Sequence, residues 1–187
     1  MIVYLHGFNS SARSHKAQVL ERFLQEQGLA AQYACPDLPP LAADAIREIE
    51  KLPLSRTTCL VGSSLGGFYA TYLVEKLGCR AVLINPAIDP QVGLRAYLGP
   101  QKNLHTGEPY QLTETHLREW EKLVVPRITP SRYLLLVETG DEVLDYRRAV
   151  ERYAGAEQVI VEGGDHSLQS FPRLLPRILE FSRADSL

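Results

Sequence analysis

The chain has 187 residues, of which 45% are hydrophobic and 22% are charged, and this composition is typical of one globular domain with a substantial core. Its formal net charge of -2 argues against a surface that holds nucleic acid phosphates or an anionic membrane. No apolar run reaches the roughly 18 residues that a membrane-spanning helix needs. The expected ligand is therefore a small molecule.

The chain begins with a short apolar run, Ile2 to Leu5, that predicts a buried strand. No basic leader or small-residue cleavage site accompanies it, so we expect a cytoplasmic protein. The three cysteines, Cys35, Cys59 and Cys79, lack C-x-x-C spacing and lie in or beside predicted strands, which favours buried, reduced thiols. No histidine pair or carboxylate cluster has metal-ligand spacing, so neither a metal nor another cofactor is expected.

Short apolar runs alternate with stretches of helical periodicity along the whole chain. The six predicted strands are residues 2–5, 31–35, 58–61, 81–84, 133–137 and 158–161. The predicted helices lie between Ser14 and Gly28 and at residues 41–52, 65–77, 145–154 and 170–183. Several strands are continuously apolar, as expected when helices cover both faces of a parallel sheet. The pattern predicts a doubly wound α/β sheet.

One long segment, residues 87–126, separates the fourth and fifth predicted strands and far exceeds the usual length of such a connection. Its middle, Leu98 to Tyr110, is rich in glycine, proline and polar residues. An apolar helical stripe follows, formed by Leu117, Trp120, Leu123 and Val124. We expect residues 87–126 to form a small cap inserted into a single domain that spans residues 1–187.

The third predicted strand runs directly into the segment GSSLGG, residues 62–67, and then into a helix. This is a G-x-S-x-G motif in the strand-to-helix setting that presents a serine as a nucleophile. Gly62 and Gly66 prevent collisions with the backbone in so tight a turn. Ser64 is therefore the predicted nucleophile, and the N–H of Leu65 at the helix start is a predicted oxyanion donor. A flexible loop or a phosphate-binding turn is the alternative interpretation.

The loop after the first strand reads HGFNSS, residues 6–11, and lacks the G-x-G-x-x-G spacing of a dinucleotide-binding turn. In enzymes with a G-x-S-x-G motif this loop supplies the second oxyanion donor, and Gly7 lets the backbone direct the N–H of Phe8 toward the site. We expect His6 to brace its own loop rather than to act as a base. For Asn9, contact with a substrate and capping of the next helix both stay open.

In enzymes with this motif, an acidic residue and then a histidine follow the serine along the chain, and residues after two later predicted strands fit this order. The fifth predicted strand leads into Asp141 and the sixth into His166, and the carboxyl ends of parallel strands meet at one edge of a sheet. His166 is the predicted base and Asp141 the acid that orients it. Asp145 competes with Asp141, but it precedes a helix and is expected to be its N-cap. The other histidines are expected at the surface or in the cap: His15, His105 and His116.

Taken together, these motifs resemble the α/β-hydrolase superfamily and, within it, the YqiA-type small bacterial esterases. The resemblance is carried by YLHGFNSS at 4–11, VGSSLGG at 61–67, NPA at 85–87, TGDEVLDY at 139–146 and EGG at 162–164. It implies a compact α/β-hydrolase fold with six parallel strands in the spatial order 2-1-3-4-5-6. It also implies hydrolysis of short or medium acyl esters, with acyl-CoA thioesters as a related substrate class.

Two functions of different kinds follow from these observations. The first is a serine esterase that forms an acyl-enzyme on Ser64 with the help of His166 and Asp141. The alternative is a non-catalytic protein that retains the hydrolase fold and binds a small molecule in its cap. The sequence leaves open the acyl chain length, the substrate-binding residues and the oligomeric state.

Overall fold

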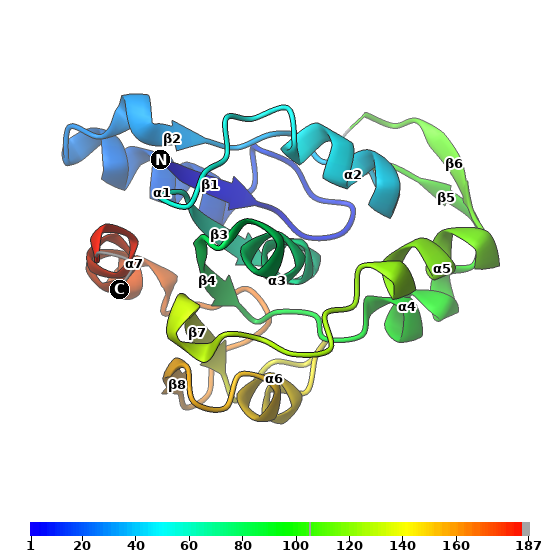
Figure 1. Cartoon of the computed structure of the whole chain (residues 1–187). Helices are drawn as coiled ribbons and strands as arrows, with labels where there is room; N and C mark the ends of the chain where they lie inside the picture. The colour runs from blue at the N-terminus through cyan, green and yellow to red at the C-terminus, as the bar shows by residue number, and fades with distance from the viewer. Residues whose placement is uncertain (105, 185–187) are drawn as a thin grey trace.

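A computed structural model of the chain describes residues 1–104 and 106–184 (Figure 1). His105, assigned to the cap from the sequence, lies outside the described residues. One parallel sheet consists of β1 (Ile2–Leu5), β2 (Tyr33–Ala34), β3 (Cys59–Ser63), β4 (Arg80–Ile84), β7 (Tyr133–Glu138) and β8 (Glu157–Val161). The strands lie in the order β2-β1-β3-β4-β7-β8. Counted within this sheet alone, that is the order 2-1-3-4-5-6 that the resemblance implied.

Helices cover both faces of the sheet, as predicted. On one face, α1 (His15–Glu26) and α7 (Phe171–Arg183) pack on residues such as Tyr4 and Val61. On the other face, α2 (Ala42–Ile49), α3 (Leu65–Leu77) and α6 (Tyr146–Arg152) pack on residues such as Val3 and Leu60. Successive residues of one strand therefore pack into the cores on opposite faces of the sheet, which explains the continuously apolar runs. Within the described ranges, no helix is both long and apolar enough to cross a bilayer.

The edge strand β2 is shorter than the predicted strand at 31–35. Residues Ala30–Gln32 form a 3-10 turn, and only Tyr33 and Ala34 pair with β1. The register explains the difference, because Tyr33 lies opposite Ile2, where β1 begins, and residues before Tyr33 therefore have no strand partner. The helices predicted at 41–52 and 145–154 likewise end earlier, at Ile49 and Arg152.

The segment 87–126 contains several short elements that Figure 1 shows gathered at one side of the molecule. They are α4 (Pro90–Gly93), the 3-10 turn η2 (Leu94–Tyr97), the antiparallel strands β5 (Gly99–Lys102) and β6 (Pro109–Leu112), and α5 (Glu114–Lys122). The predicted apolar stripe is only partly helical, because α5 ends at Lys122 before Leu123 and Val124.

Trp120 of α5 anchors this segment to the main body of the fold. Its side chain is fully buried, and its indole Nε1 donates a hydrogen bond to Tyr69 Oη of α3 at 3.0 Å. Leu117, one turn earlier, is buried in the same core cluster. Because α3 starts beside Ser64, the cap and the G-x-S-x-G turn are attached to the same helix.

This anchoring predicts a large cost for truncating Trp120. Trp120→Ala is expected to lower the free energy of unfolding by about 3–5 kcal/mol, because it empties a core position and leaves Tyr69 Oη without its donor. Leu104→Ala is the control within the cap, since Leu104 is 73% exposed, and its effect is expected within about 0.5 kcal/mol. Urea denaturation monitored by circular dichroism measures both, and equal losses would contradict the anchor.

Candidate active site

Ser64 occupies a strained turn between β3 and α3. Its φ of 53° and ψ of -117° lie where residues other than glycine are seldom found. Three backbone hydrogen bonds hold this conformation: Ser64 N–H donates to Ile84 O at 2.9 Å, and Ser64 O accepts from the N–H groups of Gly67 and Ala87 at 3.0 Å each. A strained residue persists only where its surroundings fix it in this way.

Two glycines allow the backbone to pass this turn. A Cβ at Gly62 would lie 2.4 Å from Gly66 O, and a Cβ at Gly66 would lie 2.0 Å from Leu5 O. Neither position accepts a side chain, as the motif spacing indicated. Gly7 of the loop after β1 is also close, because a Cβ there would lie 3.3 Å from Ser64 Cβ and 3.8 Å from its Oγ. This loop therefore lies directly against the Ser64 side chain.

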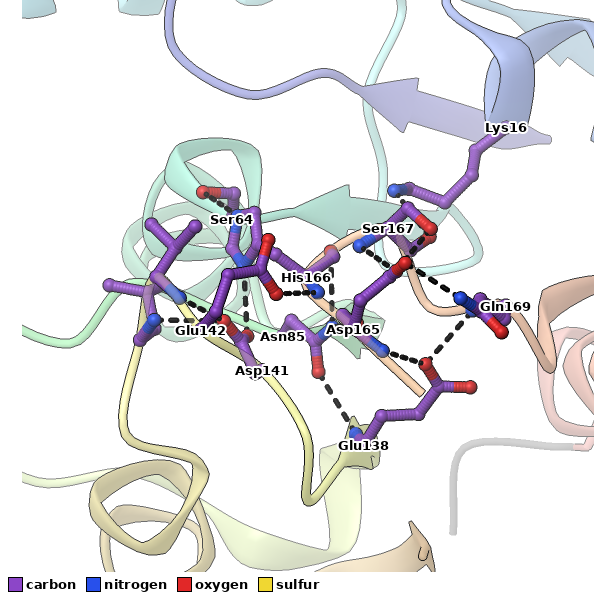
Figure 2. Close-up of polar contacts among 12 residues, drawn as sticks. Lys16, Ser64, Asn85, Glu138, Asp141, Glu142, Asp165, His166, Ser167 and Gln169 are labelled. Carbon is purple, nitrogen blue, oxygen red and sulfur yellow. Dashed lines mark hydrogen bonds and ion pairs between the residues drawn. The ribbon is translucent and has the colours of Figure 1, made fainter. Parts of the chain in front are cut away.

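The structure brings the side chains of Ser64, His166 and Asp141 together (Figure 2). His166 Nε2 lies 3.1 Å from Ser64 Oγ, and His166 Nδ1 lies 2.8 Å from Asp141 Oδ2. The three residues follow β3, β8 and β7, so they meet at the carboxyl edge of the sheet. An imidazole held between a hydroxyl and a carboxylate can accept the hydroxyl proton while the carboxylate stabilises the resulting positive charge.

The Asp141 side chain is only 1% exposed, whereas that of His166 is 22% exposed. Asp141 Oδ1 accepts hydrogen bonds from the N–H groups of Val143 and Leu144 at 2.9 and 2.8 Å. Burial by itself raises the pKa of Asp141, but the hydrogen bonds from His166 and the two backbone N–H groups outweigh it and hold the pKa below its usual value. Asp141 is therefore an anion that orients the imidazole.

The competing residues take the structural roles expected from the sequence. Asp145 is the N-cap of α6, and its side chain accepts from Arg147 N–H at 3.1 Å. His6 is buried and braces its loop, because its Nε2 accepts from Leu38 N–H at 2.8 Å. Of the other described histidines, His15 begins α1 and His116 contributes to the N-terminal cap of α5.

The two predicted oxyanion donors, the N–H groups of Leu65 and Phe8, belong to the two segments that adjoin Ser64. Leu65 is the first residue of α3, and Phe8 follows Gly7 in the loop against Ser64. Residues of the segment 87–126 contact this loop. The ring centroids of Phe8 and Tyr97 are 6.1 Å apart, and Tyr110 Oη donates to Asn9 Oδ1 at 3.1 Å. The side chain of Asn9 thus binds the cap hairpin.

Two buried polar residues beside His166 were not predicted as site residues. Asn85 follows β4 and is 2% exposed, and Glu138 is the last residue of β7 and is 1% exposed. Figure 2 shows both beneath the loop that carries His166. The sequence does contain a signal for Glu138, because it is an acidic residue at the end of an otherwise fully apolar strand. Nothing in the pattern alone indicates what it binds.

The cysteines do not join this site. Cys59 and Cys79 are buried as expected, whereas Cys35 is partly exposed. Burial raises the pKa of Cys59 to about 12 and the pKa values of Cys35 and Cys79 to about 11, so all three are neutral thiols. In the described part of the chain, no group of three or more histidine, cysteine or acidic side chains is arranged to hold a metal ion.

A cavity of about 310 Å³ lies between α3, the loop after β4 and the segment that follows α5. Its lining combines apolar residues such as Phe68, Ala87 and Leu123 with the polar Thr71, Asp89 and Arg152. Ala87 also donates its N–H to Ser64 O, so the cavity adjoins the serine turn on its cap side. Ser64, His166 and Asp141 do not themselves line this cavity, which meets the serine turn through Ala87.

Comparison with known proteins places these features in a family. Residues 1–183 match the model of the family described as "Uncharacterised protein family (UPF0227)". A UPF0227 protein of Pectobacterium atrosepticum is 24% identical over 97% of this chain and 98% of its own length. Among solved structures, α/β-hydrolase domain-containing protein 10 from mouse superposes with a TM-score of 0.71 at 18% identity, over 96% of this chain and 87% of the mouse chain.

A second structural neighbour is Est1E from Butyrivibrio proteoclasticus, with a TM-score of 0.67 at 16% identity over 96% of this chain and 85% of its own. Est1E has also been solved with ferulic acid bound. These likenesses show that the chain has the α/β-hydrolase fold, and the family match confirms the resemblance found in the sequence motifs.

The lowered pKa of Asp141 predicts how stability changes with pH. A carboxylate whose pKa is depressed on folding stabilises the fold above its unfolded pKa, and this contribution disappears as the pH falls through the folded pKa. The stability difference between the natural protein and Asp141→Asn is therefore expected to be largest near pH 7 and to narrow below about pH 4.

Urea denaturation at a series of pH values measures this difference. Asp44→Asn is the control, because the Asp44 side chain is 41% exposed and pairs with Arg47 at the surface, so its effect is expected to be small throughout. A stability gap for Asp141→Asn that stays constant down to about pH 3 contradicts the prediction.

Proposed function

The chain belongs to the UPF0227 family, and from this premise we propose that it is a serine hydrolase that cleaves carboxylic esters or thioesters through Ser64, His166 and Asp141. The hydrogen-bonded relay from Ser64 Oγ through His166 to Asp141, with contacts of 3.1 and 2.8 Å, is its strongest support. The hydroxyl end of this relay lies at a strained turn where Ser64 is partly buried, and its carboxylate end is buried, an arrangement that suits nucleophilic catalysis.

In the proposed reaction, His166 Nε2 takes the proton of Ser64 while Ser64 Oγ attacks the carbonyl carbon of the substrate. The tetrahedral intermediate collapses, and the alcohol or thiol leaves with the proton from His166. Water then attacks the acyl-enzyme, His166 accepts the water proton, and Ser64 is regenerated when that proton returns to its Oγ. Asp141 stays ionised throughout and stabilises the imidazolium form of His166.

We assign the oxyanion site to the backbone N–H groups of Phe8 and Leu65. Leu65 begins α3, where N–H groups are not used inside the helix and the helix dipole favours negative charge. Phe8 follows Gly7, which lies against the Ser64 side chain. Loss of one donor in such sites typically costs a factor of roughly 10² to 10³ in kcat.

The cavity beside Ala87 is the proposed site for the acyl group. Its volume of about 310 Å³ suits a small or medium group, and its lining is supplied by α3, by the segment 87–126 and by the end of α6. Because Est1E is a structural neighbour solved with ferulic acid, a feruloyl ester belongs among the test substrates beside straight-chain esters and acyl-CoA thioesters. We propose that the protein acts in the cytoplasm, where thiols such as those of Cys59 and Cys79 stay reduced.

Covalent labelling tests the proposal directly. After incubation with a fluorophosphonate, intact-mass spectrometry is expected to show one adduct, and peptide mapping is expected to place it on Ser64. Ser64→Ala is expected to give no adduct and to lose about 10⁴-fold or more of the ester turnover, because nothing replaces the nucleophile.

The neighbouring Ser63→Ala is the matched control. Ser63 is buried at the end of β3 and is expected to leave the labelling of Ser64 intact. The absence of any adduct on folded natural protein, together with no turnover of esters or thioesters, overturns the hydrolase proposal. The alternative, a non-catalytic protein that binds a small molecule in the hydrolase fold, then becomes the better account.

A further inference from the structure

The loop that carries His166 has no regular secondary structure of its own. It leaves β8 through Gly163 and Gly164, which have φ values of 75° and 69°, and it ends at α7. Its internal hydrogen bonds are centred on Asp165, which accepts from Leu168 N–H at its carbonyl and from Ser167 N–H at its side chain. The His166 ring instead bonds to Asp141 and Ser64, which lie outside the loop. The position of His166 therefore depends on contacts with other elements.

Glu138 supplies the first of these contacts from the end of β7. One carboxylate oxygen, Oε2, accepts from the N–H groups of Asp165 and Gln169 at 2.8 and 2.9 Å, and Oε1 accepts from Ser170 N–H at 2.7 Å. The bonded residues lie on both sides of His166 in the chain. A single buried carboxylate thus ties down the two ends of the loop.

The close fit around Glu138 is visible at Gly164. A Cβ at that position would lie 1.9 Å from Glu138 Oε2, so the loop backbone lies directly against the carboxylate. Burial raises the pKa of Glu138, but hydrogen bonds from the loop residues Ser170, Asp165 and Gln169 lower it below its usual value. The group is therefore a charged acceptor, and charge-assisted hydrogen bonds are the stronger kind.

Asn85 supplies the second contact from the end of β4. Its Nδ2 donates to the carbonyl oxygens of Asp165 and His166 at 3.2 and 3.1 Å, and its Oδ1 accepts from Glu138 N–H at 3.2 Å. An asparagine can donate and accept at once, and it tolerates the φ of 39° found here. Asn85 therefore connects the ends of β4 and β7 to the loop.

We propose that Glu138 and Asn85 form a clamp that positions His166, so that its Nε2 meets the hydroxyl of Ser64. This inference rests on the proposed function of Ser64 and His166. A buried charge is a poor way to gain stability alone, because desolvation opposes it and an apolar side chain often serves as well. Three backbone donors converging on one carboxylate do define a single loop geometry, and that geometry is what the relay needs.

Lys16 of α1 adds a contact from the opposite side of the loop. Its Nζ donates to Ser167 O at 2.8 Å, and its positive charge interacts with Asp165, Glu138 and Asp141. The cation offsets part of the negative charge that gathers at this edge. Lys16 binds the loop at Ser167 O, one residue beyond His166, and therefore supports the clamp without contacting the imidazole.

Glu138→Gln tests the clamp with a side chain of the same shape. The amide keeps one acceptor oxygen but presents an NH₂ group where the other oxygen accepted, so at least one of the three loop contacts is lost. We expect kcat for an ester substrate to fall by about 10²-fold with KM nearly unchanged, since displacing a reacting group by about 1 Å has an effect of this size.

The spectroscopic readout is the pair of imidazole ¹⁵N shifts of His166, assigned by comparison with a His166→Gln spectrum. In the natural protein they are expected to show one tautomer, with the proton on Nδ1. In Glu138→Gln they are expected to move toward the shifts of His15, whose side chain is exposed and serves as an internal reference. A loss of stability alone does not produce this change.

Glu75→Gln is the matched control. Glu75 of α3 also accepts several hydrogen bonds, from Thr129 N–H at 2.8 Å and Tyr133 Oη at 2.6 Å among others, but near the start of β7 rather than its end. This variant is expected to lose stability while kcat and the His166 shifts stay as in the natural protein. Its comparison with Glu138→Gln separates positioning from general destabilisation.

Two further measurements keep the inference testable if Glu138→Gln does not fold. Asn85→Asp keeps the shape and the acceptor but loses both donated bonds, and it is expected to change kcat and the His166 shifts in the same direction. In the natural protein, amide hydrogen exchange is expected to be slower at Asp165, Gln169 and Ser170 than at exposed loop positions.

The clamp is overturned if a folded Glu138→Gln or a folded Asn85→Asp keeps the kcat and the His166 shifts of the natural protein. Fast hydrogen exchange at the amides of Asp165, Gln169 and Ser170 in the natural protein also overturns it. If the natural protein neither labels with a fluorophosphonate nor turns over esters, the proposed function fails. The His166 shifts and the amide exchange still decide whether the clamp exists, so the two failures are distinguishable.

Discussion

The close approach of two backbones at Gly66 is the constraint on which the rest of the site depends. Because a Cβ at Gly66 would lie 2.0 Å from Leu5 O, α3 begins in direct contact with the end of β1. Ser64 is held in its strained conformation by a hydrogen bond to Ile84 at the end of β4. Strain of about 1–3 kcal/mol at one residue persists only where the surrounding structure fixes the conformation. The central order β1-β3-β4 therefore determines where Ser64 points.

Carboxylates at the same edge of the sheet then organise the histidine. Glu138 is the last residue of β7, and Asp141 lies in the loop that follows it. Both carboxylates accept hydrogen bonds from backbone N–H groups, and these bonds compensate for their burial. They act on different parts of the same residue, since Asp141 contacts the His166 ring and Glu138 holds the backbone around it. Fixed donors offset part of the desolvation cost of a buried charge and favour one arrangement of the groups around it. The ring is thus contacted by Asp141 after β7, whereas the loop backbone is held by Glu138 of β7 together with Asn85 after β4.

Whether the sequence predicts a feature of the site depends on how far apart in the chain the interacting residues lie. The turn at Ser64 is local, so the spacing of Gly62 and Gly66 predicts it, and strand periodicity predicts the edge where Asp141 and His166 meet. The clamp joins Asn85 to residues about 80 positions away, and single-chain patterns carry no information about such pairings. The hairpin β5–β6 was missed because its strands are short, largely exposed and contain proline and glycine, which weaken any strand signal.

The cap differs from the sheet edge in how it is attached, and this difference bears on specificity. Trp120 fixes it to α3 through a buried contact, whereas its hairpin contacts the loop of Phe8 and Asn9 through a hydrogen bond from Tyr110 Oη to Asn9 Oδ1. The groups proposed for chemistry come from strand ends, and the cap supplies part of the cavity wall. Changes in the cap can therefore alter the shape of the cavity while the relay from Ser64 to Asp141 stays in place, which is how one fold serves different substrates.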